Sequence, residues 1–286
     1  MNDPIAFIHI PKTAGTSFVS VLRRNEPVGR VHLPNIFSRE VELLERLESE
    51  RAAQARLLYG HVPLTLRPDF PARSRFVTFL REPIVRAYSH YRHMYNRMID
   101  TGEAPPLEAP GIPDNLQARM LCALPDPFAR PADDDLLQAA LRELDDLAFV
   151  GVLERFAESM VLAHGRLGLR WIAYRRENIR PSAPLPPEAE EILREQNQLD
   201  LQLYAHASRR LESSLAATAR RARSLEAASE ALTERRPTAQ PAALLHVAGY
   251  GAAHVDAAAR KRLARWRQWR ATRALRAAAG AARLRG

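Results

Sequence analysis

Short apolar runs alternate with amphipathic segments over the first 180 residues of the chain. The clearest runs cover residues 5–10, 57–60, 75–80 and 148–153, and a weaker one covers residues 170–174. Each run has the length of a buried strand, and the intervening segments carry apolar residues at the three- and four-residue spacing of a helix. The alternation predicts βαβ units, and hence an α/β fold with a mostly parallel sheet flanked by helices.

Helices are predicted between these runs and again toward the C-terminus. The first follows a loop at residues 11–17, the second begins after Ser38, and the third begins at Pro83, where a first helical turn tolerates proline. A long helix starts at Pro186, and its interrupted apolar stripe ends before Pro237. The apolar face of the second helix is predicted to consist of Val41, Leu44 and Leu47.

The composition excludes several classes of protein. Apolar residues make up 46% of the chain and charged residues 26%, as in soluble globular proteins. The single cysteine, Cys122, excludes an internal disulfide and a multi-cysteine zinc site, which indicates a reducing compartment. Because residues 5–10 already resemble a strand, no export leader is expected, and we predict a cytoplasmic protein.

The net charge of +9 comes from the C-terminus. Residues 257–286 hold ten Lys or Arg and no acid, whereas the remaining 256 residues carry 32 bases and 33 acids. We therefore expect no nucleic-acid binding by the folded body. We predict an α/β domain at residues 1–212 and a helical, Ala/Arg-rich extension at residues 213–286. Trp266 and Trp269 in that extension either form an interfacial helix at an anionic membrane or pack on the body.

The most informative segment is FIHIPKTAGTSF at residues 7–18. It has a P-loop-like order of strand, small-residue loop and helix, in which backbone N–H groups can surround a phosphate while Thr13, Thr16 and Ser17 add hydroxyls. It is not a Walker A sequence, because Lys12 precedes Gly15. A tight turn with incidental hydroxyls is the alternative. Only two lysines occur beside forty arginines, which indicates a need for a compact ammonium at Lys12.

A second polar cluster lies in FVTFLREPIVRAYSHY at residues 76–91. Arg81 follows a predicted strand, and Ser89 lies about two turns into the next helix. Both can therefore face one crevice at the carboxyl edge of the sheet, where a guanidinium and a hydroxyl would bind a second phosphate. The alternative is an Arg81 that pairs with Glu82 or another surface acid.

Together the two segments resemble the PAPS-dependent sulfotransferases, most closely the branch with heparan sulfate 2-O-sulfotransferase and its bacterial relatives. HIPKTAGTS at residues 9–17 is similar to that family's 5′-phosphosulfate loop. FLREPIVRAYSHY is similar to its 3′-phosphate element, with Arg81 and Ser89 in the matching positions. YGHV at residues 59–62 is similar to the segment with the catalytic histidine. Weaker similarity extends the resemblance over roughly residues 5–212.

The resemblance implies transfer of a sulfuryl group from PAPS (3′-phosphoadenosine 5′-phosphosulfate) to a hydroxyl, with PAP as product and no metal. The acceptor would be a carbohydrate, a glycolipid or another hydroxyl compound. His61 would act as the catalytic base, and Lys12 would stabilise the leaving oxygen. Arg119 would contact cofactor or acceptor, and Glu154 would orient the site. The residues implied in cofactor binding are Lys12, Thr13, Ala14, Gly15, Thr16, Ser17, Arg81 and Ser89.

Other readings of the same residues stay open. A nucleotide-dependent kinase would need a metal-binding acid, and the sequence offers no clear candidate. A non-catalytic nucleotide-binding protein would bind PAP without transferring sulfate. Among the remaining histidines, His9 is expected to be structural, and His90 and His93 to flank the cleft. The Pro- and Gly-rich segment at residues 100–113 is predicted to be a surface loop that borders the acceptor site.

Overall fold

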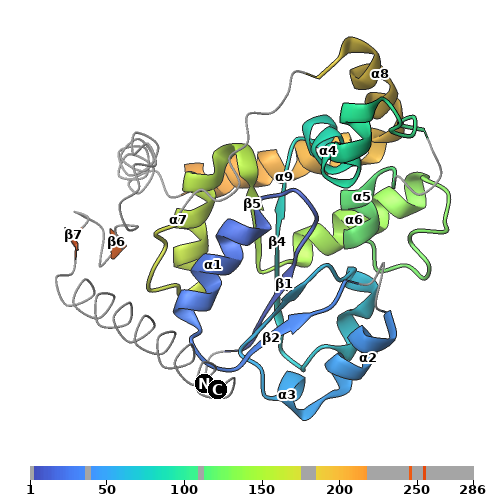
Figure 1. Cartoon of the computed structure of the whole chain (residues 1–286). Coiled ribbons are helices and arrows are strands. Elements are labelled where there is room, and N and C mark those ends of the chain that lie inside the picture. The colour runs from blue at the N-terminus through green and yellow to red at the C-terminus, as the bar shows by residue number, and fades with distance from the viewer. Residues whose placement is uncertain are drawn as a thin grey trace, which may run out of the picture.

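The fold is an open parallel sheet with helices on both faces (Figure 1). This computed structural model describes residues 3–35, 40–108, 113–174 and 185–217, and the short antiparallel strands β6 (Leu245–His246) and β7 (His254–Val255). The order in the sheet is β2-β3-β1-β4-β5, and all neighbouring pairs are parallel. These strands are β1 (Ile5–Ile8), β2 (Arg30–Leu33), β3 (Leu57–Gly60), β4 (Arg75–Leu80) and β5 (Phe149–Val152). The predicted α/β class is confirmed.

The helices form two layers. On one face, α1 and α7 cover a core cluster that contains Phe7, Val77 and Phe149. On the other face, α2, α5, α6 and α9 cover a cluster that contains Ile8, Leu58 and Val150. Because both faces are covered, the central strands are apolar on both sides. The described helices are α1 (Gly15–Asn25), α2 (Glu40–Glu48), α3 (Glu50–Ala53), α4 (Pro83–Thr101), α5 (Leu116–Leu121), α6 (Asp134–Asp146), α7 (Phe156–Leu167), α8 (Pro187–Gln196) and α9 (Gln198–Ala216), with the 3₁₀ turns η1 (Leu64–Asp69) and η2 (Leu153–Arg155).

Two strand predictions were wrong. The edge strand β2 was not predicted, because its exposed Arg30 and His32 alternate with the buried Val31 and Leu33 and interrupt the apolar run. Residues 170–174 do not form a strand of the sheet. The side chain of Asn25 binds both the N–H and the carbonyl oxygen of Trp171, at 3.0 and 2.7 Å. These bonds anchor the segment to the end of α1.

The predicted long helix from Pro186 is two helices. Asn197, with φ −120° and ψ 33°, separates α8 from α9. The side-chain oxygen of Asn115 accepts hydrogen bonds from the N–H groups of Leu199 and Asp200, so a new helix N-terminus begins there.

The predicted domain boundary after residue 212 falls inside α9, where Leu215 belongs to a buried cluster with Val152. Most of residues 218–286 lies outside the described residues, including the predicted basic segment.

One helix face was also misplaced. In α2, Leu43 is buried, whereas Leu44, predicted on the apolar face, is 36% exposed. Leu47 is buried as predicted, and the side chain of Val41 lies outside the described residues. No described helix has the length and apolarity required to cross a bilayer.

Candidate anion site at the carboxyl edge of the sheet

Four polar segments follow the carboxyl ends of neighbouring strands. The loop after β1 contains Lys12, His61 follows β3, Arg81 follows β4, and Glu154 lies just beyond β5. Because the strands are parallel, these ends meet at one edge of the sheet, which is where open α/β sheets bind their ligands. The register confirms that residues far apart in the sequence converge there.

The loop after β1 has an alternating backbone that exposes N–H groups. Lys12 and Ala14 have positive φ values of 70° and 64°, and Ala14 caps the N-terminus of α1. The N–H groups of Thr13, Ala14, Gly15 and Thr16 have no hydrogen-bond partner among the described residues. Successive free N–H groups of this kind form a concave anion site at the positive end of a helix.

The side chains of this loop differ from the sequence expectation. The Thr13 hydroxyl is fully buried and donates to the carbonyl oxygen of Ile10 at 2.9 Å, so it stabilises the loop and does not face solvent. Thr16 is exposed, and Ser17 is 6% exposed. Gly15 has a further steric role, because a Cβ there would lie 1.8 Å from Nε2 of His9. The glycine therefore makes room for an imidazole.

Arg81 connects the two sequence segments. Its Nη1 donates to the carbonyl oxygen of Lys12 at 3.2 Å, and its backbone forms two hydrogen bonds with the side-chain amide of Gln117, both at 3.0 Å. No ion pair joins Arg81 to an acid within the described ranges, so the surface pairing with Glu82 is not observed. Burial lowers the pKa of Arg81, and the carboxylates of Glu154 and Glu82 oppose this effect.

The helix after Arg81 carries the other predicted phosphate ligand. Ser89 lies about two turns into α4 and is partly buried. The N-terminus of this helix is held by Glu82, whose carboxylate accepts from the N–H of Val85 at 2.7 Å. Glu154 in turn accepts from the N–H of Glu82 and from the hydroxyl of Tyr204, at 3.0 and 2.9 Å. Glu154 thus fixes the position of α4 relative to β5 and α9.

Sequence reasoning did not identify Arg86 as part of this region. Arg86 is only 1% exposed, and its Nε and Nη1 have no partner in the described part of the chain. The fully buried carboxylate of Asp200 attracts it electrostatically, but this carboxylate already accepts from the N–H groups of Gln117 and Ala118, at 3.0 and 2.7 Å. A buried guanidinium with unsatisfied donors is costly unless an anion or water completes it.

His90, one helical turn after Arg86, is also part of the region. Its Nδ1 is buried and has no partner among the described residues. Burial lowers the pKa of His90 to about 4, and the positive charges of Arg86, His93, Lys12 and His61 add to the effect. The spacing of four residues between Arg86 and His90 was the available sequence signal, since such residues share a helix face.

His61 has the hydrogen bond that a general base requires. Its Nδ1 lies 2.6 Å from the carbonyl oxygen of His9. A carbonyl oxygen can only accept, so the neutral imidazole carries its proton on Nδ1 and its lone pair on Nε2. Burial lowers the pKa of His61 and the charge of His32 lowers it further, whereas the bond to His9 raises it.

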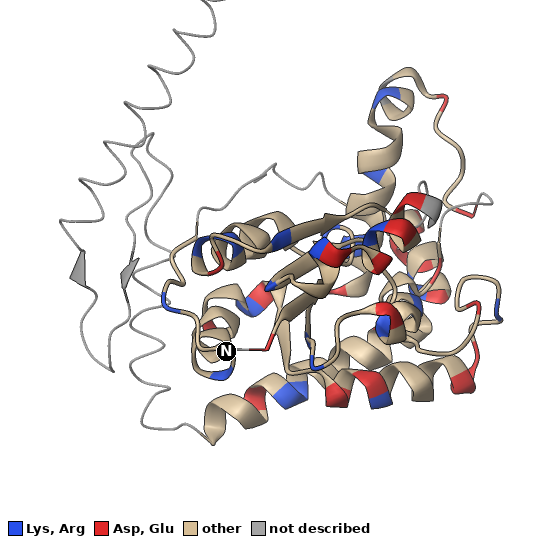
Figure 2. Cartoon of the chain, turned by 90° about the horizontal axis from the view of Figure 1, so that it is seen from below, with Lys and Arg blue, Asp and Glu red and all other residues tan. Residues whose placement is uncertain are grey.

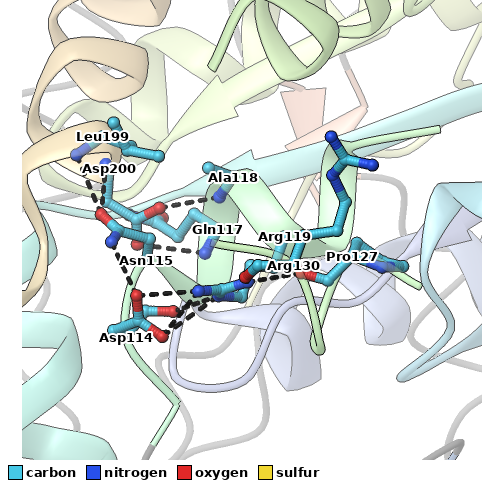
Figure 3. A network of polar contacts seen from close by, with 9 residues as sticks. All are labelled: Asp114, Asn115, Gln117, Ala118, Arg119, Pro127, Arg130, Leu199 and Asp200. Carbon is cyan, nitrogen blue, oxygen red and sulfur yellow. Dashed lines mark hydrogen bonds and ion pairs between the residues drawn. The ribbon is translucent and has the colours of Figure 1, made fainter. Parts of the chain in front are cut away.

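The guanidinium of Arg119 is not available to bind a ligand at this edge. Arg119 is 5% exposed, and its guanidinium pairs with both carboxylate oxygens of Asp114 at 2.9 Å (Figure 3). It also donates to the carbonyl oxygens of Pro127 and Arg130. The guanidinium is thus occupied within the protein, and it holds the loop between α5 and α6. This arrangement contradicts the expected contact with cofactor or acceptor.

Outside this edge, the described helices carry charged residues of both signs. Figure 2 shows acidic and basic residues interspersed over the described helices. Within the described residues, no three His, Cys, Asp or Glu side chains form a group that could hold a metal ion.

The comparisons with family models and with curated proteins found no relative of this chain. No family model matches the chain, and no curated protein matches its sequence.

Proposed function

We propose that this protein is a PAPS-dependent sulfotransferase that transfers a sulfuryl group to a hydroxyl and releases PAP. The observation that carries the proposal is the contact between the Arg81 guanidinium and the carbonyl oxygen of Lys12, beside His61. It supports a single site in which a loop with free N–H groups and an arginine bind two anionic groups of one nucleotide.

The residues present fit a bisphosphorylated nucleotide. The free N–H groups of Thr13–Thr16 and the Lys12 ammonium would hold the 5′-phosphosulfate, and Arg81 and Ser89 would hold the 3′-phosphate. The unsatisfied nitrogens of Arg86 add positive potential beside Arg81. When bound, PAPS supplies the sulfuryl group.

The chain's own groups have distinct tasks in this reaction. The acceptor oxygen forms a bond to sulfur while the bond from sulfur to the phosphate oxygen breaks. Nε2 of His61 takes the acceptor's hydroxyl proton, and the Lys12 ammonium offsets the charge on the leaving oxygen. The backbone N–H groups keep the anionic donor in line, which is the main requirement of a loose transfer.

The acceptor and the cellular setting belong to the same proposal. The acceptor would be a carbohydrate, a glycolipid or another hydroxyl compound, and the protein would act in the cytoplasm without metal or nucleic acid. Residues 257–286 would bring it to anionic membranes if the acceptor is a lipid.

Transfer of labelled sulfate from PAPS to a panel of sugars and glycolipids tests the proposal. His61→Ala and Lys12→Ala should each lower kcat by roughly 10²–10⁴-fold, while His61→Ala should keep its affinity for PAP in calorimetry. Glu45→Gln, at an exposed position on α2, is the matched control and should behave as wild type. Binding of PAP without transfer to any acceptor would identify a non-catalytic binding protein, and Mg²⁺-dependent ATP turnover would identify a kinase. Either result would refute sulfotransfer.

A further inference from the structure

Three aromatic rings form a stack that ends at His61. The rings of His9 and His61 have centroids 4.2 Å apart and planes 29° apart, and His9 stacks in turn on Phe7 at 5.4 Å and 17°. Phe7 and His9 are two residues apart on an extended segment, so their side chains lie on the same face. Gly60 pairs with Ile8 in the sheet, which brings the next residues, His9 and His61, side by side.

His9 also provides the hydrogen bond that fixes the His61 tautomer. Its carbonyl oxygen accepts from Nδ1 of His61 at 2.6 Å. One residue therefore restrains the partner imidazole twice, since the carbonyl sets the rotation of the ring and the stacked imidazole covers one ring face. The ring of His9 is in turn held against Gly15 at the start of α1, where a Cβ would overlap it.

The stacked imidazole of His9 does not take up protons near neutral pH. Burial lowers the pKa of His9 to about 3, with smaller contributions from the charges of His61 and His32. The ionisable groups that act on His61 are His9 after β1, His32 on β2 and His90 on α4. The side chains of all three are neutral or cationic, so none of their charges favours a protonated His61, and only the carbonyl oxygen of His9 raises its pKa.

We infer that His9 is a positioning residue for His61: its stacked ring and its carbonyl oxygen hold the His61 imidazole with Nε2 unprotonated and directed for proton transfer. This inference rests on the proposed function for its catalytic consequence. Its structural content, the orientation and proton affinity of His61, does not depend on any substrate.

Two variants of the full chain separate the ring from the carbonyl. His9→Phe keeps a flat ring and the backbone carbonyl, whereas His9→Ala keeps only the carbonyl. Long-range ¹H–¹⁵N NMR spectra, assigned with His61→Asn, report the tautomer and the titration midpoint of His61. In His9→Ala, His61 should be better hydrated, and its midpoint should rise toward about 6.5, the value of an unperturbed histidine. The Nδ1–H tautomer should persist in both variants, because both keep the carbonyl oxygen that accepts from Nδ1. His9→Phe should stay close to wild type.

The transfer reaction gives the second readout. In His9→Ala, kcat at pH 6 should fall by up to roughly fourfold, because a base with a pKa of about 6.5 is about three-quarters protonated at that pH. The loss should shrink toward pH 8, KM for PAPS should stay within about twofold, and His9→Phe should restore the rate. An unchanged titration midpoint of His61 in a folded His9→Ala would overturn the inference, even if wild type transfers sulfate. Absence of transfer by wild type would refute the proposed function alone, because the NMR result needs no substrate.

Discussion

The guanidinium of Arg81 donates a hydrogen bond to the carbonyl oxygen of Lys12 across 69 residues of sequence. The two residues follow the neighbouring parallel strands β1 and β4, so the contact is a direct consequence of the strand pairing. It aligns the second polar segment with the free N–H groups of the first. Under the proposed function, binding of a nucleotide with two anionic ends would depend on this contact.

Arg81 should contribute more to nucleotide affinity than to the chemical step. Arg81→Ala removes a charged donor and is expected to raise the Kd for PAP by roughly 10- to 100-fold, corresponding to a loss of about 1.5–3 kcal/mol. Arg81→Lys keeps the charge but not the planar fork, so it should give an intermediate affinity. Isothermal titration calorimetry measures both values.

The control for this series is Arg142→Ala, which removes an exposed arginine from α6. Its affinity for PAP should equal that of wild type. Equal PAP affinities for Arg81→Ala and wild type would show that the guanidinium binds no part of the nucleotide.

Acidification should destabilise the fold through two histidines. The pKa of His9 is about 3 and that of His90 about 4 in the folded protein, against about 6.5 in an unfolded chain. Their folded values are depressed, so the stability they contribute is fully present above about pH 6.5 and is lost as the pH falls toward 4 and 3. In this window the unfolded chain binds protons that the native state does not, and the free energy of unfolding falls with pH.

Urea denaturation between about pH 5 and 6.5 measures this effect, because most carboxylates remain ionised there. Each histidine adds a slope of up to about 1.4 kcal/mol per pH unit. His9→Phe and His90→Gln should each flatten the wild-type curve. If both variants keep the wild-type slope, the acid sensitivity arises from other groups.

Asn115 and Asp200 cap each other's helices, and the pair should be important for stability. The Asn115 oxygen accepts from two N–H groups of α9, and the Asp200 carboxylate accepts from two N–H groups of α5 (Figure 3). Asp200→Ala also leaves the buried Arg86 without its acidic partner and should cost about 3–5 kcal/mol. Asn115→Ala loses only a cap and should cost about 1–2 kcal/mol.

Chemical denaturation of these variants distinguishes the two roles. Gln198→Ala, at an exposed position beside Asn197, is the control and should change the free energy of unfolding by less than about 0.5 kcal/mol. Equal costs for Asp200→Ala and Asn115→Ala would mean that Arg86 does not depend on Asp200.

The sequence predicted those elements whose signal is local. Strands β1, β3, β4 and β5 are short apolar runs, so their burial on both faces is visible in the pattern. β2 is an edge strand with alternating polarity and lacks that signal. The end of α8 is set by Asn115, more than 80 residues away, and no local pattern can show it.

The same distinction applies to the candidate site. The loop around Lys12, the strand end at Arg81 and the position of His61 follow from local order in the sequence, and the strand pairing brings them together. The buried state of Arg86 and the inward orientation of the Thr13 hydroxyl depend on tertiary packing. They could not be read from residue types alone.

Gly60 should be essential for the geometry at His61. A Cβ on Gly60 would lie 2.4 Å from the carbonyl oxygen of Leu33, so Gly60→Ala must push β2 and β3 apart. We expect a loss of about 1–3 kcal/mol in the free energy of unfolding, as for other overpacked positions. Because His61 follows Gly60 directly, kcat should fall. The Kd for PAP should stay near wild type, because the proposed nucleotide ligands follow β1 and β4 and not β3. Gly168→Ala is the control, since its Cβ would meet no atom within 4 Å and only its φ of 68° is strained. It should lower stability without lowering kcat, so an equal loss of kcat in both variants would mean that Gly60→Ala acts through general destabilisation and not through His61.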